Sequence, residues 1–382
     1  MANQATERGR IVERIQGLEK DQAANGQGPL SFFAIYLLTG LGLWLVSMGG
    51  FYTLLAPVGL TFVAVPILDV VIGVDTRNAS EAAPSAFKTA LFRLATWLAL
   101  PLQGALLIWG AAFVTKPTAS LLELIGVVVA VGTTGGVIGI TVAHELAHRA
   151  SRLDRTLGKV LLVLVCYFHW ATEHVAGHHR RVATREDPAT ARLGEALPVF
   201  LMRSVAQTFV SSWQIEATRN ARRGVQSRLK NPVLWGVLGS CSLAAVLCFS
   251  FGWPALWFFF AQSAVAIAFL ETINYIEHYG LERRQLRPGV YERVTPLHSW
   301  NASQWLTNVL LFNLQRHSDH HAWPTRPYYK LRHHPQAPQL PTGYAGMALL
   351  AMVPPLWRRV MDPRVAAHRA MLAAEAPTTG PN

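Results

Sequence analysis

The sequence predicts an all-α integral membrane protein, with six transmembrane helices and a cytoplasmic cap of helices and loops that carries clustered histidines. Three observations support this prediction. The 382-residue chain is 51% hydrophobic and only 15% charged, whereas soluble domains carry about 25% charged residues. Six stretches stay apolar over about 20 residues, the length that crosses a bilayer. The basic residues lie almost entirely on one side of these stretches.

The predicted spans form two groups, four before a large polar segment in the middle of the chain and two after it. They cover residues 30–49, 51–74, 91–114, 121–142, 232–251 and 254–273. We expect tight hairpins at Gly50 and at Gly252, because only a few residues separate the flanking spans. The predicted organisation is a polar N-terminal tail (1–29) without the apolar core of a signal peptide, a single membrane domain (30–363) and a C-terminal tail (364–382).

The positions of Lys and Arg predict the orientation in the membrane. With six spans, Lys116 is the only one of the 34 basic residues that falls on one face, and the rest fall on the other. Because positive charge stays in the cytoplasm, we expect both termini and the cap segments 143–231 and 274–363 to be cytoplasmic. This topology accounts for the net charge of +12 without any nucleic-acid partner.

Histidine is concentrated in three short windows, HELAH (144–148), HVAGHH (174–179) and HSDHH (317–321). Together these 16 residues hold eight of the 14 histidines, where random placement would put fewer than one. Histidines within a window are three or four residues apart, and such positions share one face of a helix. We therefore expect each window to present two or three imidazoles to one point.

A further histidine, His278, stands just past the sixth predicted span, as His144 stands just past the fourth. All four motifs therefore reach the same membrane depth. The candidate ligands are His144, His148, His174, His178, His179, His278, His317, His320 and His321. Zinc takes four ligands, so nine histidines suit two ions with four or five nitrogens each. Imidazole binds Fe, Cu, Zn and Ni, and a pair of metals among imidazoles is typical of oxygen activation.

Acidic residues accompany the histidine windows. Metal-bound histidines usually donate their second ring nitrogen to a carboxylate. The candidates for this role are Glu145, Glu173, Asp187, Glu277 and Asp319, and His298 is a further candidate beside the last window. The alternative is that they are ordinary surface acids. We interpret the isolated histidines, His169, His333, His334 and His368, as surface or core residues. HELAH also matches the HExxH helix of zinc proteases, but that interpretation leaves the other clustered histidines without a role.

Four motifs bear a resemblance to a known family. HELAHR, EHVAGHHRRVATREDPATAR, NYIEHYGL (274–281) and LQRHSDHHAWPTRPY together resemble the membrane alkane monooxygenases, which are integral-membrane di-iron alkane hydroxylases. PILDVVIG, LHSWN, PQLPTGYAGM and VMDP follow the same order, so the resemblance runs from about residue 30 to 363. The departures are Ala147 in the first box and Val175 and Ala176 in the second, none of them a ligand position.

The resemblance implies that the nine histidines hold two non-haem irons and no haem. It implies terminal hydroxylation of an alkane from the membrane to a primary alcohol, with O₂ as co-substrate, in the bacterial inner membrane. The family takes electrons from rubredoxin, which an NAD(P)H-dependent reductase reduces. The three cysteines include no CxxC pair, so the rubredoxin must be a separate protein. We expect cytoplasmic arginines to dock it.

The resemblance also implies that the second span lines the substrate channel. Thr61 is a small residue there, so we expect the channel to accept medium-to-long alkanes. Two alternatives stay open. One is another membrane di-iron enzyme, an acyl-lipid desaturase or a hydroxylase of aromatic methyl groups. The other is a non-enzymatic metal transporter or haem carrier. A transporter would place ionisable residues in the middle of its spans, whereas here the histidines lie at span ends.

Overall fold

A computed structural model describes residues 27–225 and 227–375, and the predicted N-terminal tail lies almost wholly outside them. Within the described ranges, six helices are long and apolar enough to cross a membrane, as predicted. They are Pro29–Ser47, Tyr52–Ile72, Ala86–Phe113, Leu121–Ala147, Pro232–Phe251 and Trp253–His278.

Three of these helices are longer than the apolar stretches that predicted them. The third begins at Ala86 rather than at residue 91, because the Ser85 side chain caps the helix by accepting a hydrogen bond from the Lys88 amide. The fourth and sixth continue beyond their predicted ends, so His144 and His278 lie within the helices and not just past them. The hydropathy criterion ends a span at its first polar residues, whereas here those residues are buried against protein.

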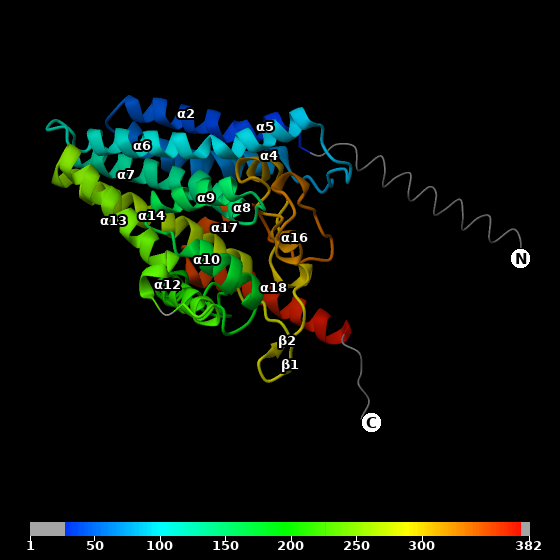
Figure 1. Ribbon diagram of the computed structural model, residues 1–382. Coiled ribbons are helices and arrows are strands. Elements are labelled where there is room, and N and C mark those ends of the chain that lie inside the picture. The colour runs from blue at the N-terminus through cyan, green and yellow to red at the C-terminus, as the bar shows by residue number, and fades with distance from the viewer. Residues whose placement is uncertain (1–26, 226, 376–382) are drawn as a thin grey trace, which may run out of the picture.

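The long helices are built from shorter elements and lie side by side in Figure 1. The first joins η1 (Pro29–Phe33) to α2 (Ala34–Ser47), and the second joins α3 (Tyr52–Gly59), η2 (Leu60–Ala64) and α4 (Val65–Ile72). The third comprises α5 (Ala86–Trp97) and α6 (Ala99–Phe113), and the fourth comprises α7 (Leu121–Thr134), η3 (Gly135–Ile140) and α8 (Thr141–Ala147). The last two are α13 (Pro232–Phe251) and α14 (Trp253–His278).

The predicted hairpins lie at the end of the bundle away from the histidine windows. Gly49 and Gly50 turn the chain between α2 and α3 with positive φ angles of 75° and 54°, and Gly252 turns it between α13 and α14 with φ of 85°. Glycine adopts these angles without steric cost. The amide of Gly50 donates to Glu123 at the start of α7, which joins the first hairpin to the fourth helix.

Close approach of the fourth helix, through α7 and η3, to α14 holds the middle of the bundle together. Gly132 and Gly136 lie one turn apart. A Cβ atom on Gly132 would stand 2.6 Å from Val265 Cβ, and one on Gly136 would stand 2.8 Å from Phe269 Cβ. Small residues one turn apart let membrane helices pack backbone to backbone. This contact aligns the two helices whose last turns carry His144 and His278.

Three segments of the bundle and cap are π-helical: η2, η3 and η4 (His174–His178). A π turn holds one residue more than an α turn, so it rotates every later side chain about the helix axis. We did not predict these segments, because tertiary packing and not local propensity decides where a π turn forms.

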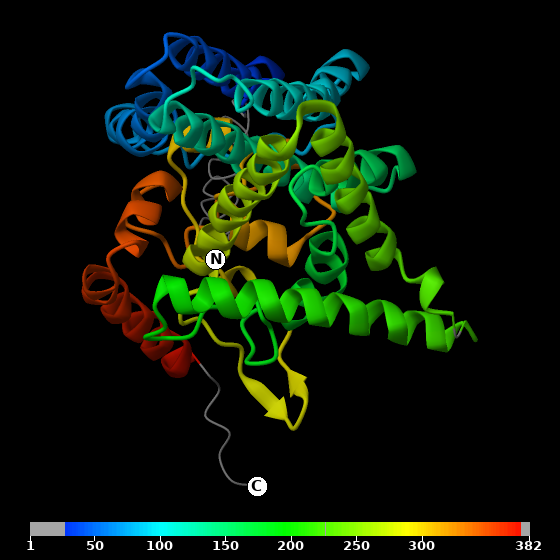
Figure 2. The ribbon, with the colours of Figure 1, turned by 90° about the vertical axis from the view of Figure 1, so that its left-hand side faces the viewer.

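The cap covers one end and one side of the bundle. Its elements before α13 are α9 (Arg152–Val163), α10 (Trp170–Glu173), η4, α11 (His179–Arg181), α12 (Leu197–Arg222) and η5 (Arg228–Lys230). After α14 come β1 (Gln285–Arg287), β2 (Val290–Tyr291), η6 (Pro296–His298), α15 (Trp305–Leu310), α16 (His317–Ala322), η7 (Tyr328–Lys330), α17 (Tyr344–Ala351) and α18 (Pro354–Glu375). Figure 2 shows α12 in green crossing below the bundle and the antiparallel β1–β2 hairpin extending beneath it.

Residues 364–375 of the predicted C-terminal tail belong to a helix in the structure. Helix α18 continues to Glu375, and its Trp357 ring lies 4.9 Å from the ring of Tyr275 near the end of α14. Val365 is fully buried beside Gly280, and Arg369 donates two hydrogen bonds to the Gly280 carbonyl.

Candidate metal centre

The nine candidate histidines come together in two adjacent groups at the cap end of the bundle. The first group contains His144, His148, His174, His179 and His320, and the second contains His178, His278, His317 and His321. Within each group, one potential ligand atom per residue lies within 4.8 Å of every other. The groups are neighbours, since the rings of His178 and His179 are 5.9 Å apart. The division into five and four is the division that two ions would require.

The windows are divided between the groups differently from the prediction. His174 and His178 were expected to share a point at α-helical spacing, but His174 pairs with His179 and His178 belongs to the other group. The π-helical turn η4 is the reason, since it brings residues five apart onto one face. In the third window, His317 and His321 share a group, while His320 faces the other. The second and third windows therefore each serve both groups, and only the first serves one.

The ring nitrogens are spaced as ligands of a common ion would be. In the first group His320 Nε2 lies 2.9 Å from His144 Nε2 and 3.0 Å from His179 Nε2. In the second group the Nε2 atoms of His317 and His321 are 2.9 Å apart. If each nitrogen bound a metal at about 2.1 Å, ligands at right angles would be about 3.0 Å apart. The observed spacing fits that arrangement.

The protonation state of the rings also suits metal binding. Burial, followed by the other histidines, lowers the pKa of His174, His179, His317, His320 and His321 well below the usual value. Burial lowers the pKa of His148 to about 3. Its Nε2 atom is buried without a hydrogen-bond partner. Neutral imidazole with a free lone pair is the form that ligates metals, so these residues fit a bound ion.

Two of the predicted carboxylates contact the histidines. Asp187 Oδ2 lies 2.8 Å from His178 Nδ1 and accepts a hydrogen bond from the Thr190 hydroxyl. Glu277 Oε2 lies 3.1 Å from His317 Nε2. Asp187 thus makes the contact that orients a metal-bound imidazole.

The other candidates for a supporting role contact different partners. Glu145, Glu173 and Asp319 pair with Arg149, Arg181 and Arg326 respectively. His298 caps η6, where its Nδ1 accepts from the Thr295 amide, and its Nε2 faces Glu292. None of these four makes a hydrogen bond or ion pair with the nine histidines among the described residues. His334, which we had interpreted as isolated, lies 2.7 Å from Asp319.

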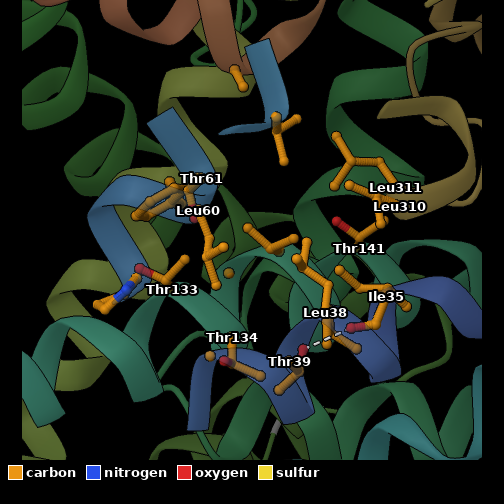
Figure 3. Close-up of a pocket in the computed structure, with 18 of the residues that line it drawn as sticks. Ile35, Leu38, Thr39, Leu60, Thr61, Thr133, Thr134, Thr141, Leu310 and Leu311 are labelled. Carbon is orange, nitrogen blue, oxygen red and sulfur yellow. Dashed lines mark hydrogen bonds between the residues drawn. The ribbon is translucent and has the colours of Figure 1, made fainter. Parts of the chain in front are cut away.

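An apolar cavity of about 140 Å³ runs through the bundle beside the two groups. Its walls come from α2, the α3–η2–α4 helix, the α7–η3–α8 helix, α14, α15 and α17. Figure 3 shows Leu60 and Thr61 on one wall, facing Leu310 and Leu311 on another. Thr61, which we predicted to line a substrate channel, therefore lines this cavity.

The cavity extends from the hairpin end of the bundle toward the end that carries the histidines, although none of the nine histidines is among its lining residues. Val46, at the hairpin end, lines it, and so do Thr141, Ile273 and Leu314. These last three precede His144, His278 and His317 by a turn or little more. We predicted only the second helix as a wall. The walls from α15 and α17 were missed because both helices are too short for a membrane span.

Comparisons with known proteins agree with the motifs. Residues 118–350 match the family described as Fatty acid desaturase. Alkane 1-monooxygenase 2 of Pseudomonas aeruginosa is 42% identical over 346 residues, which cover 88% of this chain and 92% of that protein. Alkane 1-monooxygenase 1 of the same organism is 43% identical over 309 residues, which cover 80% and 81%. Alkane 1-monooxygenase of Ectopseudomonas oleovorans is 41% identical over 330 residues, which cover 85% and 82%.

This chain belongs to the alkane 1-monooxygenase family. The resemblance seen in the four motifs is therefore confirmed. Members of the alkane 1-monooxygenase family are enzymes, which sets aside the metal transporter and the haem carrier. The match to Fatty acid desaturase is consistent with the spacing of the histidine windows, which this family shares with membrane desaturases.

One residue that contacts a predicted carboxylate was not among our candidates. Tyr344, the first residue of α17, donates a hydrogen bond from its hydroxyl to Glu277 Oε1 at 2.7 Å and also lines the cavity. It stands within PQLPTGYAGM, a segment that contributed to the resemblance to the alkane 1-monooxygenase family. Because Glu277 is 67 positions away in the sequence, no local pattern predicts that Tyr344 contacts it.

Proposed function

We propose that this protein hydroxylates the terminal carbon of alkanes, using O₂ at two non-haem irons held by the two histidine groups. The observation that carries the proposal is the apolar cavity whose walls include Thr141, Ile273 and Leu314, residues that stand three to five positions before His144, His278 and His317 of the two groups. The names of the relatives point to the same substrate class and reaction. When bound, the two irons would supply the activation of O₂ that insertion into a C–H bond requires.

The chain's own residues would select and orient the substrate. An alkane offers no hydrogen bond, so its recognition rests on burial of its surface against apolar walls. A cavity that extends toward the histidines at one end would admit a chain end first. Its apolar walls exclude water from the reacting carbon. Asp187, by accepting from His178 Nδ1, would hold that ring with Nε2 directed at the metal.

The protein would lie in the bacterial inner membrane with both termini and the cap in the cytoplasm. Lys116 stands between α6 and α7, at the hairpin end of the bundle. The other basic residues of the described ranges lie at the opposite end or in the cap. This unequal distribution of basic residues agrees with the positive-inside rule if the cap lies in the cytoplasm. Labelling of Lys116→Cys and Arg287→Cys, each in a chain whose native Cys166, Cys241 and Cys248 are replaced, in intact cells with a membrane-impermeant reagent tests the orientation.

Electrons would come from a separate rubredoxin reduced by an NAD(P)H-dependent reductase. Exposed arginines lie close to the histidines, notably Arg180, directly after His179, and Arg185. The β1–β2 hairpin packs on this segment, since the Tyr291 hydroxyl donates to Glu186. It adds exposed Arg284 and Arg287. Small acidic redox proteins dock on such surfaces, so turnover with rubredoxin would fall as ionic strength rises. Turnover that is indifferent to salt would contradict this docking.

The test of the function uses membranes or purified protein with a rubredoxin and its reductase. We expect octane or hexadecane to yield 1-alkanol, together with non-haem iron and no Soret band. An unsaturated product from an acyl lipid would favour a desaturase, and oxidation of toluene methyl groups in preference to alkanes would favour an aromatic-methyl hydroxylase. Purified protein that carries no transition metal would contradict the proposal.

A further inference from the structure

Helix α12 (Leu197–Arg222) has polar residues on its buried side and apolar residues on its exposed side. Beyond Phe200, all of its buried residues are polar, namely Ser204, Thr208, Ser211, Ser212 and Glu216. On the other side, apolar residues three or four positions apart form a row that we call the apolar stripe: Val199, Met202, Ala206, Phe209, Val210, the partly buried Trp213 and Ala217. Met202 is 78% exposed and Val210 is 53% exposed. A helix on a water-soluble domain has the reverse arrangement, so the apolar stripe fits an apolar environment rather than water.

Contacts of the buried polar residues fix the orientation of α12. Ser204 donates a hydrogen bond to Glu271 of α14, and Ser211 accepts one from Arg181 at 2.8 Å. Rotating α12 to bury the apolar stripe would leave these polar groups without partners, which is costly. The apolar stripe is therefore held facing away from the rest of the described chain.

The position of α12 is that of a helix at the surface of a bilayer. The spans run across the view in Figure 1, and Figure 2, turned by 90°, shows α12 lying crosswise to them. Its partner Glu271 lies about two turns before the end of α14 at His278. Helix α13 begins at Pro232, shortly after α12 ends, and Trp235 in its first turn is 60% exposed. Exposed tryptophan is typical of the boundary between lipid and water, so the apolar stripe lies near the depth of that boundary.

Basic residues follow the apolar stripe along the chain. Arg222, Arg223, Arg228 and Lys230 are exposed, and none forms an ion pair with another described residue. Leu229, among them, is 67% exposed. An amphipathic helix that combines an apolar face with basic residues binds in the plane of a bilayer that contains anionic lipids. The charge of this segment therefore complements a phosphate headgroup.

We propose that α12 lies in the cytoplasmic surface of the membrane, with the apolar stripe among acyl chains and the four basic residues on anionic phospholipid headgroups. A lipid accounts for both features, whereas a second copy of the chain would cover the stripe and leave the basic residues without a counter-charge. The inference depends on the membrane location in the proposed function and not on the proposed chemistry. The lipid surface would thereby support the second histidine window, because α12 packs on η4, which carries His174 and His178.

Spin labels on single cysteines test the position of the apolar stripe in bilayer discs of phosphatidylethanolamine and phosphatidylglycerol, in a chain without its native Cys166, Cys241 and Cys248. Relaxation by O₂ reports contact with lipid, and relaxation by a nickel chelate reports contact with water. A label at Val210→Cys should favour O₂, like the lipid reference Val246→Cys, whose native side chain is 58% exposed on α13. Gln214→Cys, exposed and one turn further along α12, should favour nickel, like Arg287→Cys in the β1–β2 hairpin.

The outcomes of this experiment separate lipid from the other possibilities. Nickel relaxation at Val210→Cys as strong as at Gln214→Cys would overturn the proposal. Spin–spin broadening between labels at Val210→Cys would also overturn it, since it would place a second copy of the chain on the apolar stripe. Nickel relaxation at Val246→Cys would instead contradict the proposed membrane location.

The headgroup contact is tested by the lipids that copurify with the protein from vesicles of equal parts phosphatidylglycerol and phosphatidylcholine. A basic residue at an anionic surface strengthens binding about fivefold. Arg222→Gln combined with Arg223→Gln should therefore lower the excess of phosphatidylglycerol severalfold. The matched control combines Arg284→Gln with Arg287→Gln, which changes two exposed arginines beside the β1–β2 hairpin and should keep the wild-type excess. An equal excess in the two double variants would overturn the contact with anionic lipid.

Discussion

His174 and His179 are five residues apart, yet their Nε2 atoms lie 3.1 Å from each other. The π turn η4 produces this pairing, and it sends His178 to the second group. Neighbouring histidines in one short motif therefore serve different ions in the proposed centre.

This division predicts that His178→Ala and His179→Ala have different effects on the metal. Each variant should lose most of the iron of one group and keep that of the other, because each removes one donor from a different set. Both should lose hydroxylation. Mössbauer spectra of ⁵⁷Fe-loaded protein would show which signal disappears. Loss of the same signal in both variants would contradict the division.

The contact between His178 and Asp187 predicts a second effect. Asp187→Asn keeps the size of the side chain but weakens the hydrogen bond that orients His178. Loss of such a partner typically costs 10- to 100-fold in metal affinity, and we expect about that loss for the four-histidine group. Iron retained during dialysis against a chelator measures it. Asp154→Asn is the control, because Asp154 is also buried but pairs with Trp97. Equal losses in both variants would contradict a role through His178.

The sequence predicted the parts of this molecule that depend on local pattern. Six spans follow from runs of apolar residues, and the nine histidines follow from their crowding into three windows and one span end. The groups they form could not be predicted from α-helical spacing. His174 and His178 share a face only in a regular α-helix, and the π turn that separates them depends on packing against α10, α11 and α12.

The residues that the carboxylates contact could not be predicted from the sequence either. Asp187 and Glu145 looked equivalent as acids near a histidine window. In the structure Asp187 contacts His178, whereas Glu145 pairs with Arg149, four residues further along the chain. Which of the two contacts forms depends on how the cap folds back on the bundle. The role of Tyr344 depends likewise on α17 lying against α14.

The packing of η3 on α14 predicts a cost for any side chain at Gly136. Gly136→Ala places a Cβ 2.8 Å from Phe269 Cβ and 3.0 Å from the Ala266 carbonyl oxygen. Overpacking of this kind costs about 1–3 kcal/mol, so we expect lower thermal stability of the purified protein in detergent. Gly104→Ala in α6 is the control, since its Cβ would meet nothing within 4 Å. A Gly136→Ala protein as stable as Gly104→Ala would contradict the close approach.

Chain-length preference should depend on Thr61. This residue lines the cavity from η2, the middle of the second span. A tryptophan there would divide the cavity between the hairpin end and the histidines. Long alkanes could then no longer occupy the half of the cavity at the hairpin end, whereas short alkanes would still fit in the half nearer the histidines. Since overpacking costs about 1–3 kcal/mol, we expect Thr61→Trp to lower the ratio of hexadecane to octane hydroxylation roughly tenfold or more.

The control for this change adds the same bulk outside the cavity. Val63 lies two residues further along η2, is 56% exposed and does not line the cavity. Val63→Trp should therefore keep the wild-type ratio of the two 1-alkanols, measured by gas chromatography after incubation with equal amounts of both substrates. If Thr61→Trp gives the same ratio as Val63→Trp, Thr61 packs between helices without limiting the substrate, and the limit on chain length lies elsewhere along the cavity wall.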